Sequence, residues 1–271
     1  AFKARREDVV KDLKRHGVTA HPTPYSPWGL RVDGKPNLTR FEAYLRGDFE
    51  VQDEGSQLLA LLVDAHRGEM VVDFCAGAGG KTLALGAAMR STGRLYAFDT
   101  SAHRLDALKP RLARSGLSNV HPVAISHERD DRIKRLAGKI DRVLVDAPCS
   151  GLGTLRRNPD LKWRQSPDGI APLAALQLSI IQSASRLLKP GGRLVYATCS
   201  LLEQENEQVA AEFSGQNPDF EPVDVAHTLQ ALKVPQAATL CRQRDAEVSQ
   251  LRLWPHLHRV DGFFAAIWEK K

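Results

Sequence analysis

The sequence lacks the features that mark a membrane protein or a disulfide-stapled scaffold. None of its apolar runs approaches the roughly 20 residues that a membrane-spanning helix needs, and its basic start has no apolar core of the secretory type. Its four cysteines are widely spaced and include no Cys-x-x-Cys pair, which argues against a disulfide framework and a zinc cluster. We therefore expect a cytoplasmic protein with reduced thiols, no membrane partner and no metal.

Internal repeats, low-complexity segments and signs of disorder are also missing, so the 271 residues should bury a sizeable core. The net charge of +6 is a mild excess that suits a polyanionic partner and equally suits an ordinary solvated surface. Local clustering favours a nucleic-acid partner, because an aromatic ring among basic side chains can stack on a base. The candidate nucleic-acid contacts are Arg156, Arg157, Lys162, Trp163 and Arg164.

The chain divides into a short amino-terminal part and a larger α/β part. Residues 1–50 combine a basic helical pattern with a Pro-, Gly- and aromatic-rich stretch, which predicts a small α+β appendage truncated at its start. Residues 51–271 alternate strand and helix patterns, which is typical of a doubly wound, Rossmann-like, mostly parallel sheet. The predicted strands are 70–74, 94–98, 120–125, 141–145 and 193–197, with a closing antiparallel hairpin of 251–254 and 263–268. The predicted helices are 6–16, 57–66, 81–89, 102–113 and one that ends at Leu188.

Two cysteines follow the most apolar strands of the larger part. Cys149 and Cys199 each come after a run too apolar to be anything but a central strand. Ligands of open α/β sheets bind beyond the carboxyl ends of strands, so we expect both thiols to share one crevice. A cysteine at a strand end is more often a packing residue, and we expect this of Cys75 and Cys241.

A glycine-rich turn follows the first predicted strand and opens a helix. Its residues are Asp73, Phe74, Cys75, Ala76, Gly77, Ala78, Gly79, Gly80, Lys81 and Thr82. Glycines let the backbone approach a ligand, and the amino end of a helix favours an electron-rich group. The next strand ends in Asp99, whose carboxylate can accept hydrogen bonds from both ribose hydroxyls. Together they indicate a nucleoside-containing cofactor, with helix capping as the alternative role of Asp99.

Three cofactor classes compete for this turn. Gly80, Lys81 and Thr82 resemble the end of the phosphate-binding loop of an NTPase, but Cys75 stands where that loop requires its first glycine. The turn also does not complete the G-x-G-x-x-G spacing of a dinucleotide site. S-adenosylmethionine needs a glycine turn and an acidic residue but no phosphate cradle, and therefore fits best.

Several motifs together resemble the NOP/Sun family of RNA cytosine-5 methyltransferases. They are 75–82, Asp146-Ala147-Pro148-Cys149-Ser150-Gly151 with 153–160 and 162–164, Thr198-Cys199-Ser200 with Glu203, Glu205 and Asn206, 49–54, and Asp261-Gly262-Phe263-Phe264. The resemblance extends over nearly the whole chain. It implies that the protein uses S-adenosylmethionine to form 5-methylcytosine in RNA, with 16S ribosomal RNA as the expected substrate.

The resemblance also assigns roles to individual residues. It implies that Cys199 adds to carbon 6 of cytosine and that Cys149 assists breakdown of the adduct. The residues alone leave this order open, because DNA cytosine methyltransferases use a Pro-Cys nucleophile at the position of Cys149. Asp146 is expected to hydrogen-bond cytosine N3. The implied cofactor-binding residues are Cys75, Ala76, Gly77, Ala78, Gly79, Gly80, Lys81, Asp99, Arg104, Ser126 and Asp146.

The chain departs from the family pattern at two places. Gly77-Ala78 stands where Ala-Pro is usual, and the carboxylate that contacts adenine after the third strand has no obvious equivalent near Ser126. Two alternatives of other classes stay open: a catalytically silent RNA-binding or ribosome assembly factor, and a P-loop-like NTPase.

Overall fold

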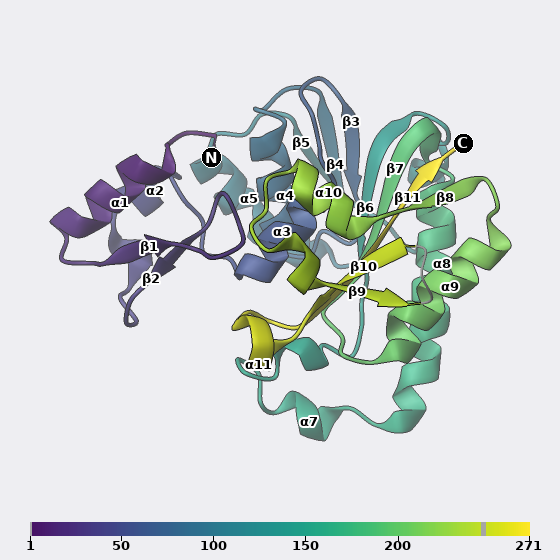
Figure 1. Ribbon diagram of the computed structural model, residues 1–271. Helices are drawn as coiled ribbons and strands as arrows, with labels where there is room; N and C mark the ends of the chain where they lie inside the picture. Colours follow the sequence, from purple (N-terminus) through teal and green to yellow (C-terminus); the bar gives the residue numbers. More distant parts are fainter. Residues whose placement is uncertain (1, 245–247) are drawn as a thin grey trace.

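A nine-stranded mixed sheet forms the centre of the computed structural model, which describes residues 2–244 and 248–271 (Figure 1). Its strands are β3 (Met70–Asp73), β4 (Arg94–Asp99), β5 (Val120–Ala124), β6 (Ile140–Asp146), β7 (Leu188–Thr198), β8 (Phe220–Val223), β9 (Cys241–Arg244), β10 (Val248–Leu253) and β11 (Phe263–Lys270). Their order is β5-β4-β3-β6-β7-β11-β10-β9, and β8 pairs with β11 beside this path.

The strands from β5 to β7 run parallel, which confirms the doubly wound sheet expected from the sequence. The chain moves outward from β3 to β5 and then returns to β6 on the other side of β3, so the strand order reverses between β3 and β6. Ligands of doubly wound sheets bind at this reversal. The predicted antiparallel hairpin is also confirmed, since β10 pairs with β11 from Leu251↔Ala265 to Leu253↔Phe263.

The α-helices are α1 (Arg6–Arg15), α2 (Glu42–Leu45), α3 (Glu54–Leu62), α4 (Gly80–Ala88), α5 (Ala102–Ser115), α6 (Asp131–Lys134), α7 (Leu161–Arg164), α8 (Ile170–Ser185), α9 (Glu207–Gln216), α10 (Val225–Ala231) and α11 (Pro255–His258). Short 3-10 turns are η1 (Leu38–Arg40), η2 (Leu152–Thr154), η3 (Pro167–Gly169), η4 (Glu203–Glu205) and η5 (Ala237–Leu240). None of the helices in the described ranges is both long and apolar enough to cross a bilayer.

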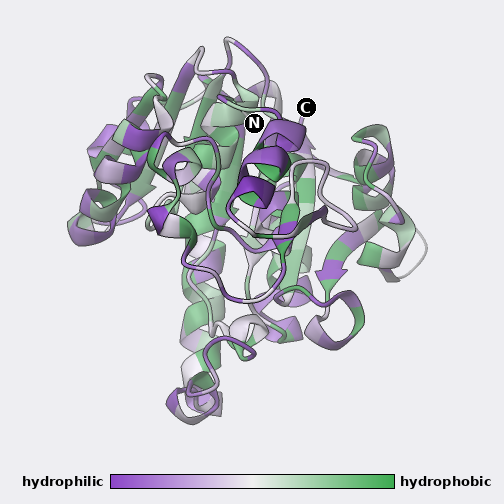
Figure 2. Ribbon diagram, turned by 90° about the vertical axis from the view of Figure 1, so that its left-hand side faces the viewer, coloured by the Kyte–Doolittle hydropathy of each residue, from purple (hydrophilic) through white to green (hydrophobic). Residues whose placement is uncertain are grey.

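Helices cover both faces of the sheet because successive strand side chains point to opposite sides. Val71 of β3 packs in a cluster with α3, α4 and α10, and its neighbour Val72 packs in another with α8 and α9. Figure 2 shows the resulting distribution, with hydrophobic strands at the centre and hydrophilic residues on the outer helices.

The predicted end of one helix at Leu188 is wrong. Helix α8 ends at Ser185, and Leu188 is the first residue of β7, where it pairs with Ile140 of β6. The register then shifts before Arg142 pairs with Arg193, so residues 189–192 form an irregularity within β7 just after its pairing with β6 begins. An apolar residue shortly before Pro and Gly can end a helix or begin a strand. The pairing of Leu188 with β6 makes it the start of a strand here.

Residues 2–50 build a small core of their own. Strands β1 (Ala20–Pro22) and β2 (Leu30–Val32) pair antiparallel, and Val9 and Leu13 of α1 pack beside them. Figure 1 shows this part at one side of the main sheet. The Nζ of Lys3 donates to the carbonyl oxygen of Arg114 on α5 at 2.7 Å, so the part is tied to the sheet's helical layer. A domain boundary at residue 50 stays a prediction.

Candidate active site

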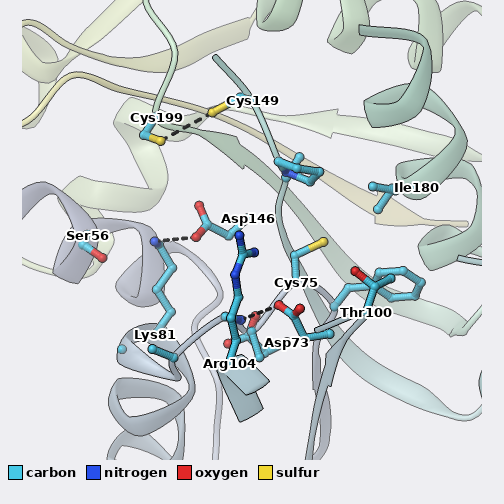
Figure 3. Close-up of a pocket in the computed structure, with 18 of the residues that line it drawn as sticks. Ser56, Asp73, Cys75, Lys81, Thr100, Arg104, Asp146, Cys149, Ile180 and Cys199 are labelled. Carbon is cyan, nitrogen blue, oxygen red and sulfur yellow. Dashed lines mark hydrogen bonds and ion pairs between the residues drawn. The ribbon is translucent and has the colours of Figure 1, made fainter. Parts of the chain in front are cut away.

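A cavity of about 600 Å³ opens at the carboxyl ends of β3, β4, β6 and β7 (Figure 3). Its wall includes Asp73, Asp99 and Asp146, which end β3, β4 and β6, and Cys199, which follows β7 by one residue. The cavity therefore lies at the reversal of strand order, and parallel strands bring side chains far apart in sequence to one place.

The glycine turn between β3 and α4 is shaped by close packing. Gly79 has a φ of +82°, and a Cβ there would lie 2.1 Å from Leu108 of α5, so the position requires glycine. The N–H of Gly77 donates to Asp99 Oδ2 at 2.8 Å, and the N–H of Ser101 donates to Asp99 Oδ1 at 2.7 Å. Ser101, not Asp99, is the N-cap of α5, so the capping alternative for Asp99 is wrong. Each oxygen of Asp99 thus accepts one backbone hydrogen bond and has capacity for another, and the residue lines the cavity.

Most of the predicted cofactor-binding residues line this cavity: Cys75, Ala76, Gly77, Ala78, Gly80, Lys81, Asp99, Arg104 and Asp146. Gly79 does not, because it faces Leu108 behind the turn. Ser126 does not either, since its N–H and hydroxyl both donate to Asp130 Oδ2, at 2.9 and 3.0 Å. Glu128, which follows β5 in the same loop, lines the cavity instead. A hydrogen bond from the hydroxyl of Ser179 lowers the pKa of Glu128, which favours its ionised form.

Asp73 is the most deeply buried carboxyl group of the cavity wall. Burial raises its pKa to about 7, against the opposing effect of the hydrogen bond that the Thr82 hydroxyl donates at 2.7 Å. Its Oδ1 is buried and has no hydrogen-bond partner among the described residues. A buried acceptor without a partner is costly, and a donor group of a bound ligand would satisfy it.

Lys81 and Asp146 form an ion pair under the two cysteines, with Nζ and Oδ2 2.7 Å apart (Figure 3). Burial alone would lower the pKa of Lys81, but the negative charge of Asp146 and their hydrogen bond outweigh it, so the pKa ends above its usual value. Lys81 therefore stays a cation inside the cavity. The pair fixes the Asp146 carboxylate at the end of β6.

The thiols of Cys149 and Cys199 face each other across the cavity, with their Sγ atoms 3.4 Å apart (Figure 3). The hydrogen bond from Cys149 lowers the pKa of Cys199, assisted by the charge of Lys81 and opposed by burial and Asp146. The same bond and burial raise the pKa of Cys149 well above its ordinary value. These directions favour Cys149 as the donor and Cys199 as the group that ionises to the thiolate, which is the nucleophilic form of cysteine.

The other two cysteines are held as neutral thiols. Burial raises the pKa of Cys75 well above its ordinary value and raises the pKa of Cys241 to about 12. Cys75 lies in the cavity wall, whereas Cys241 packs against the core cluster below β10. Neither has the activated environment of Cys199.

The predicted nucleic-acid contacts fall into two groups. Arg156 bonds to Asp261 at 2.6 Å and to Asp53 at 2.5 Å, and Arg157 bonds to the second oxygen of Asp261 and lines the cavity. These two ion pairs give Arg156 a structural role, because they link it to residues that are far from it in the sequence. Trp163 on α7, in contrast, is 81% exposed. Its neighbours Lys162 and Arg164 are exposed too, and Arg164 pairs with Asp160 at 2.7 Å.

Some wall residues have no signal in the sequence. Ile180 comes from the middle of α8, Arg111 from α5 and Ser56 from α3, where apolar periodicity or charge gives no hint of a cavity. Gln52 and Phe263 also line the wall, and both fall within motifs that carried the family resemblance. A second cavity of about 820 Å³ lies between α7, α8 and α9; Lys162 lines it, and none of the described catalytic or cofactor candidates does. Among residues 2–244 and 248–271, no cluster of His, Cys, Asp and Glu is placed to hold a metal ion.

The family model and the similar proteins agree on one family. Residues 60–269 match the family model described as 16S rRNA methyltransferase RsmB/F. The chain is 35% identical over 270 residues to the probable ribosomal RNA small subunit methyltransferase B of Synechocystis, covering 99% of this chain and 58% of that protein. It is 33% identical to the human 28S rRNA (cytosine(4447)-C(5))-methyltransferase, covering 99% of this chain and 33% of that protein.

The solved structures agree with the sequence comparison. The crystal structure of PH0851 superposes with a TM-score of 0.89 at 36% identity, covering all of this chain and 58% of that one. The chain thus spans about three fifths of the length of the bacterial relative and of this structure.

Proposed function

Because the chain belongs to the RsmB/F family of 16S rRNA methyltransferases, we propose that it forms 5-methylcytosine in ribosomal RNA in the cytoplasm, with S-adenosylmethionine as methyl donor. The observation that carries the proposal is the pair of thiols 3.4 Å apart, with the pKa of Cys199 lowered, in a cavity at the reversal of strand order. Carbon 5 of cytosine is a poor nucleophile, and a thiolate that adds at carbon 6 overcomes this.

The cavity fits the proposed cofactor. Asp99 has acceptor capacity left for ribose hydroxyls, and the glycine turn lets a ligand lie close to the backbone. The Oδ1 of Asp73, which has no partner among the described residues, can accept a hydrogen bond from the cofactor. Glu128 is the carboxylate we assign to the adenine end, in place of Ser126. When bound, S-adenosylmethionine supplies an electrophilic methyl group.

The first half of the reaction belongs to Cys199. Its thiolate adds to carbon 6 of cytosine, which forms a carbon–sulfur bond and moves the electron pair of the 5,6 double bond toward carbon 5. N3 takes up a proton from water as the thiolate adds, and the Asp146 carboxylate, fixed by Lys81 at 2.7 Å, accepts the hydrogen bond from N3–H; this proton leaves again when the aromatic ring is restored. Carbon 5 would then take the methyl group with that electron pair, as the methyl–sulfur bond of the sulfonium donor breaks and leaves a neutral thioether. The target base must be single-stranded or flipped out to reach the cavity.

The second half needs a base, and Cys149 is placed to act as one. Its own proton passes to solvent once Cys199, the partner of its hydrogen bond, is bound to carbon 6, and its thiolate then accepts the proton from carbon 5. The electron pair released from the carbon–hydrogen bond restores the 5,6 double bond, and the carbon–sulfur bond to Cys199 breaks. The 3.4 Å separation of the thiols lets both reach the same base.

The decisive experiment incubates the protein with ribosomal RNA and S-adenosylmethionine and maps new 5-methylcytosine at base resolution. We expect methylation by the wild type and none by Cys199→Ala, which also forms no covalent RNA adduct. Cys241→Ala, which removes a packing thiol outside the cavity, is the matched control and should retain activity. Methylation by Cys199→Ala would assign the nucleophile elsewhere. RNA binding without methylation by the wild type would favour the silent assembly factor, and ATP turnover would favour the NTPase.

A further inference from the structure

A buried glutamate joins the two loops that carry the cysteines. Glu205 lies in η4, six residues after Cys199, and its side chain is fully buried. Its Oε1 accepts from the N–H of Ser150 at 2.8 Å, and its Oε2 accepts from the Ser150 hydroxyl at 2.5 Å and from the Ser200 hydroxyl. Ser150 and Ser200 are the residues directly after Cys149 and Cys199.

The same carboxyl group is anchored from a third element. The amide of Gln177 on α8 donates to Glu205 Oε1 at 3.0 Å and to the carbonyl oxygen of Pro148 at 2.9 Å. The hydroxyl of Tyr196 in β7 donates to the backbone oxygen of Glu205 at 2.5 Å. Four donors thus converge on the two carboxylate oxygens, which equals the acceptor capacity of an ionised carboxylate.

The side chains that make this network lie outside the cavity wall, so they do not touch the substrate. They instead fix the backbone next to each sulfur atom. Burying a carboxylate costs free energy unless its oxygens are fully hydrogen-bonded. We therefore expect such a group where it fixes a geometry that packing alone does not determine.

We propose that Glu205 is the positioning residue that holds the thiols of Cys149 and Cys199 at bonding distance, by tying Ser150 to Ser200. Its value for methylation rests on the function proposed above, whereas its effect on the two thiols does not. Hydrogen bonds from hydroxyl groups a single residue away from each sulfur limit how far the loops can separate. The thiol–thiolate bond, and with it the activation of Cys199, depends on that limit.

The charged groups around the thiols make the effect measurable. Asp146 raises the pKa of Cys199 and Lys81 lowers it, while the charge of Glu205 raises the pKa of Cys149. Tyr196 is the other ionisable member of the network, and burial keeps its pKa far above the ordinary value. Removing a negative charge by itself would lower thiol pKa values. Losing the thiol–thiolate bond instead raises the pKa of Cys199, so the two effects have opposite signs.

The test is the pH profile of alkylation of the full chain by iodoacetamide, with each cysteine followed by peptide mass spectrometry. Glu205→Gln keeps the shape of the side chain but turns one acceptor into a donor. We expect its Cys199 midpoint to rise by about one pH unit. Its kcat for rRNA methylation should fall roughly 100-fold with an unchanged KM for RNA. Glu205→Asp keeps the charge, so its Cys199 alkylation midpoint should lie between those of Glu205→Gln and the wild type.

Glu212→Gln is the matched control, because it makes the same change at an exposed position of the neighbouring helix α9. A folded Glu205→Gln protein with the wild-type Cys199 midpoint, or with a lowered one, overturns the proposal. If Glu205→Gln does not fold, Ser150→Ala and Ser200→Ala each remove one hydroxyl link. Both should then raise the midpoint, and wild-type profiles in both overturn it. A wild type that makes no 5-methylcytosine refutes the proposed function and leaves this thiol readout intact.

Discussion

At the scale of the residue, the two thiols differ because the hydrogen bond between them shifts their pKa values in opposite directions. Their sulfurs are 3.4 Å apart, yet the pKa of Cys199 is lowered and that of Cys149 is raised. The hydrogen bond from Cys149 is the largest cause of the lowered pKa of Cys199; burial and Asp146 oppose it, and Lys81 adds a smaller effect in the same direction as the hydrogen bond. The sequence places both cysteines at strand ends but cannot rank them, since the ranking depends on the hydrogen bond between them and on burial, which only the fold creates.

Cys149→Ala should therefore uncouple the two halves of the reaction. Cys199 can still add to carbon 6, but the base that removes the carbon 5 proton is gone, so the adduct persists. We expect a protein–RNA band that survives denaturing electrophoresis, with little released product. The same band should be missing from the double variant Cys149→Ala/Cys199→Ala. Free methylated RNA from Cys149→Ala at the wild-type rate contradicts this division of roles.

Asp73 makes the stability of the protein depend on pH. Its pKa is about 7 in the folded protein against an ordinary value of 3.8, so the folded state holds its proton more tightly than the unfolded chain does. The linkage relation then requires the stability contributed by this group to be fully present below pH 3.8 and to be lost as pH rises to about 7. A shift of roughly three units corresponds to about 4 kcal/mol.

Asp73→Asn should remove this dependence. As pH rises from about 4 to 7, the free energy of unfolding of the variant should increase relative to that of the wild type, by up to about 4 kcal/mol. Urea denaturation at several pH values without cofactor measures it. Asp106→Asn changes an exposed carboxylate on α5 and serves as the control. Parallel curves for wild type and Asp73→Asn would show that the buried carboxyl does not titrate in this range.

At the scale of the element, η2 packs the β6 loop against two other strands. The N–H of Gly153 donates to the carbonyl oxygen of Cys199 at 2.8 Å, and its own carbonyl accepts from Gly262 at 2.8 Å. A Cβ at Gly153 would lie 2.1 Å from the oxygen of Gly262 and 2.7 Å from that of Cys199. Both obstacles are backbone atoms, so an alanine must push the cysteine loops apart.

Gly153→Ala should lower the free energy of unfolding by about 1–3 kcal/mol, the usual cost of overpacking. It should also slow methylation, because the Cys199 backbone moves. Urea denaturation and initial rates measure the two effects. Gly169→Ala is the control, since a Cβ there would lie an ordinary 3.6 Å from Ser166 Oγ. Unchanged stability and rate in Gly153→Ala would mean that the loops yield without consequence.

The order of the elements follows from the sequence better than their contacts do. Strands β3 to β7 stand out as apolar runs between helical patterns, and the parallel sheet follows from that alternation. Strands β8 and β9 escape prediction, because they are short edge segments whose pairing with β11 and β10 depends on tertiary contacts. Arg156 shows the same limit for a side chain. Its charge suggests a nucleic-acid contact, but the buried Asp261, more than one hundred positions away, engages it.

At the scale of the whole molecule, α7 presents exposed basic side chains beside an exposed indole ring. Figures 1 and 2 show the segment around α7 at the lower tip, apart from the central sheet. Lys162, Trp163 and Arg164 are exposed there. Arg164 forms one ion pair, with Asp160, whereas Arg156 is held by two carboxylates. If RNA runs from this tip to the cavity, basic residues should bind phosphate and the indole should stack on a base.

Replacing Lys162 and Arg164 together with alanine should then reduce the salt dependence of RNA binding. Each phosphate contact to a single strand contributes about 0.7 to the slope of log affinity against log salt, so two lost contacts lower its magnitude by about 1.4. Trp163→Ala should weaken binding with little change in slope, because stacking releases no counterions. Lys109→Ala/Lys134→Ala, which removes two exposed lysines from α5 and α6, is the control and should leave the slope unchanged. The measurement is the affinity for rRNA fragments, titrated at several salt concentrations. A slope that the α7 substitutions leave unaltered would mean that the RNA follows another path to the cavity.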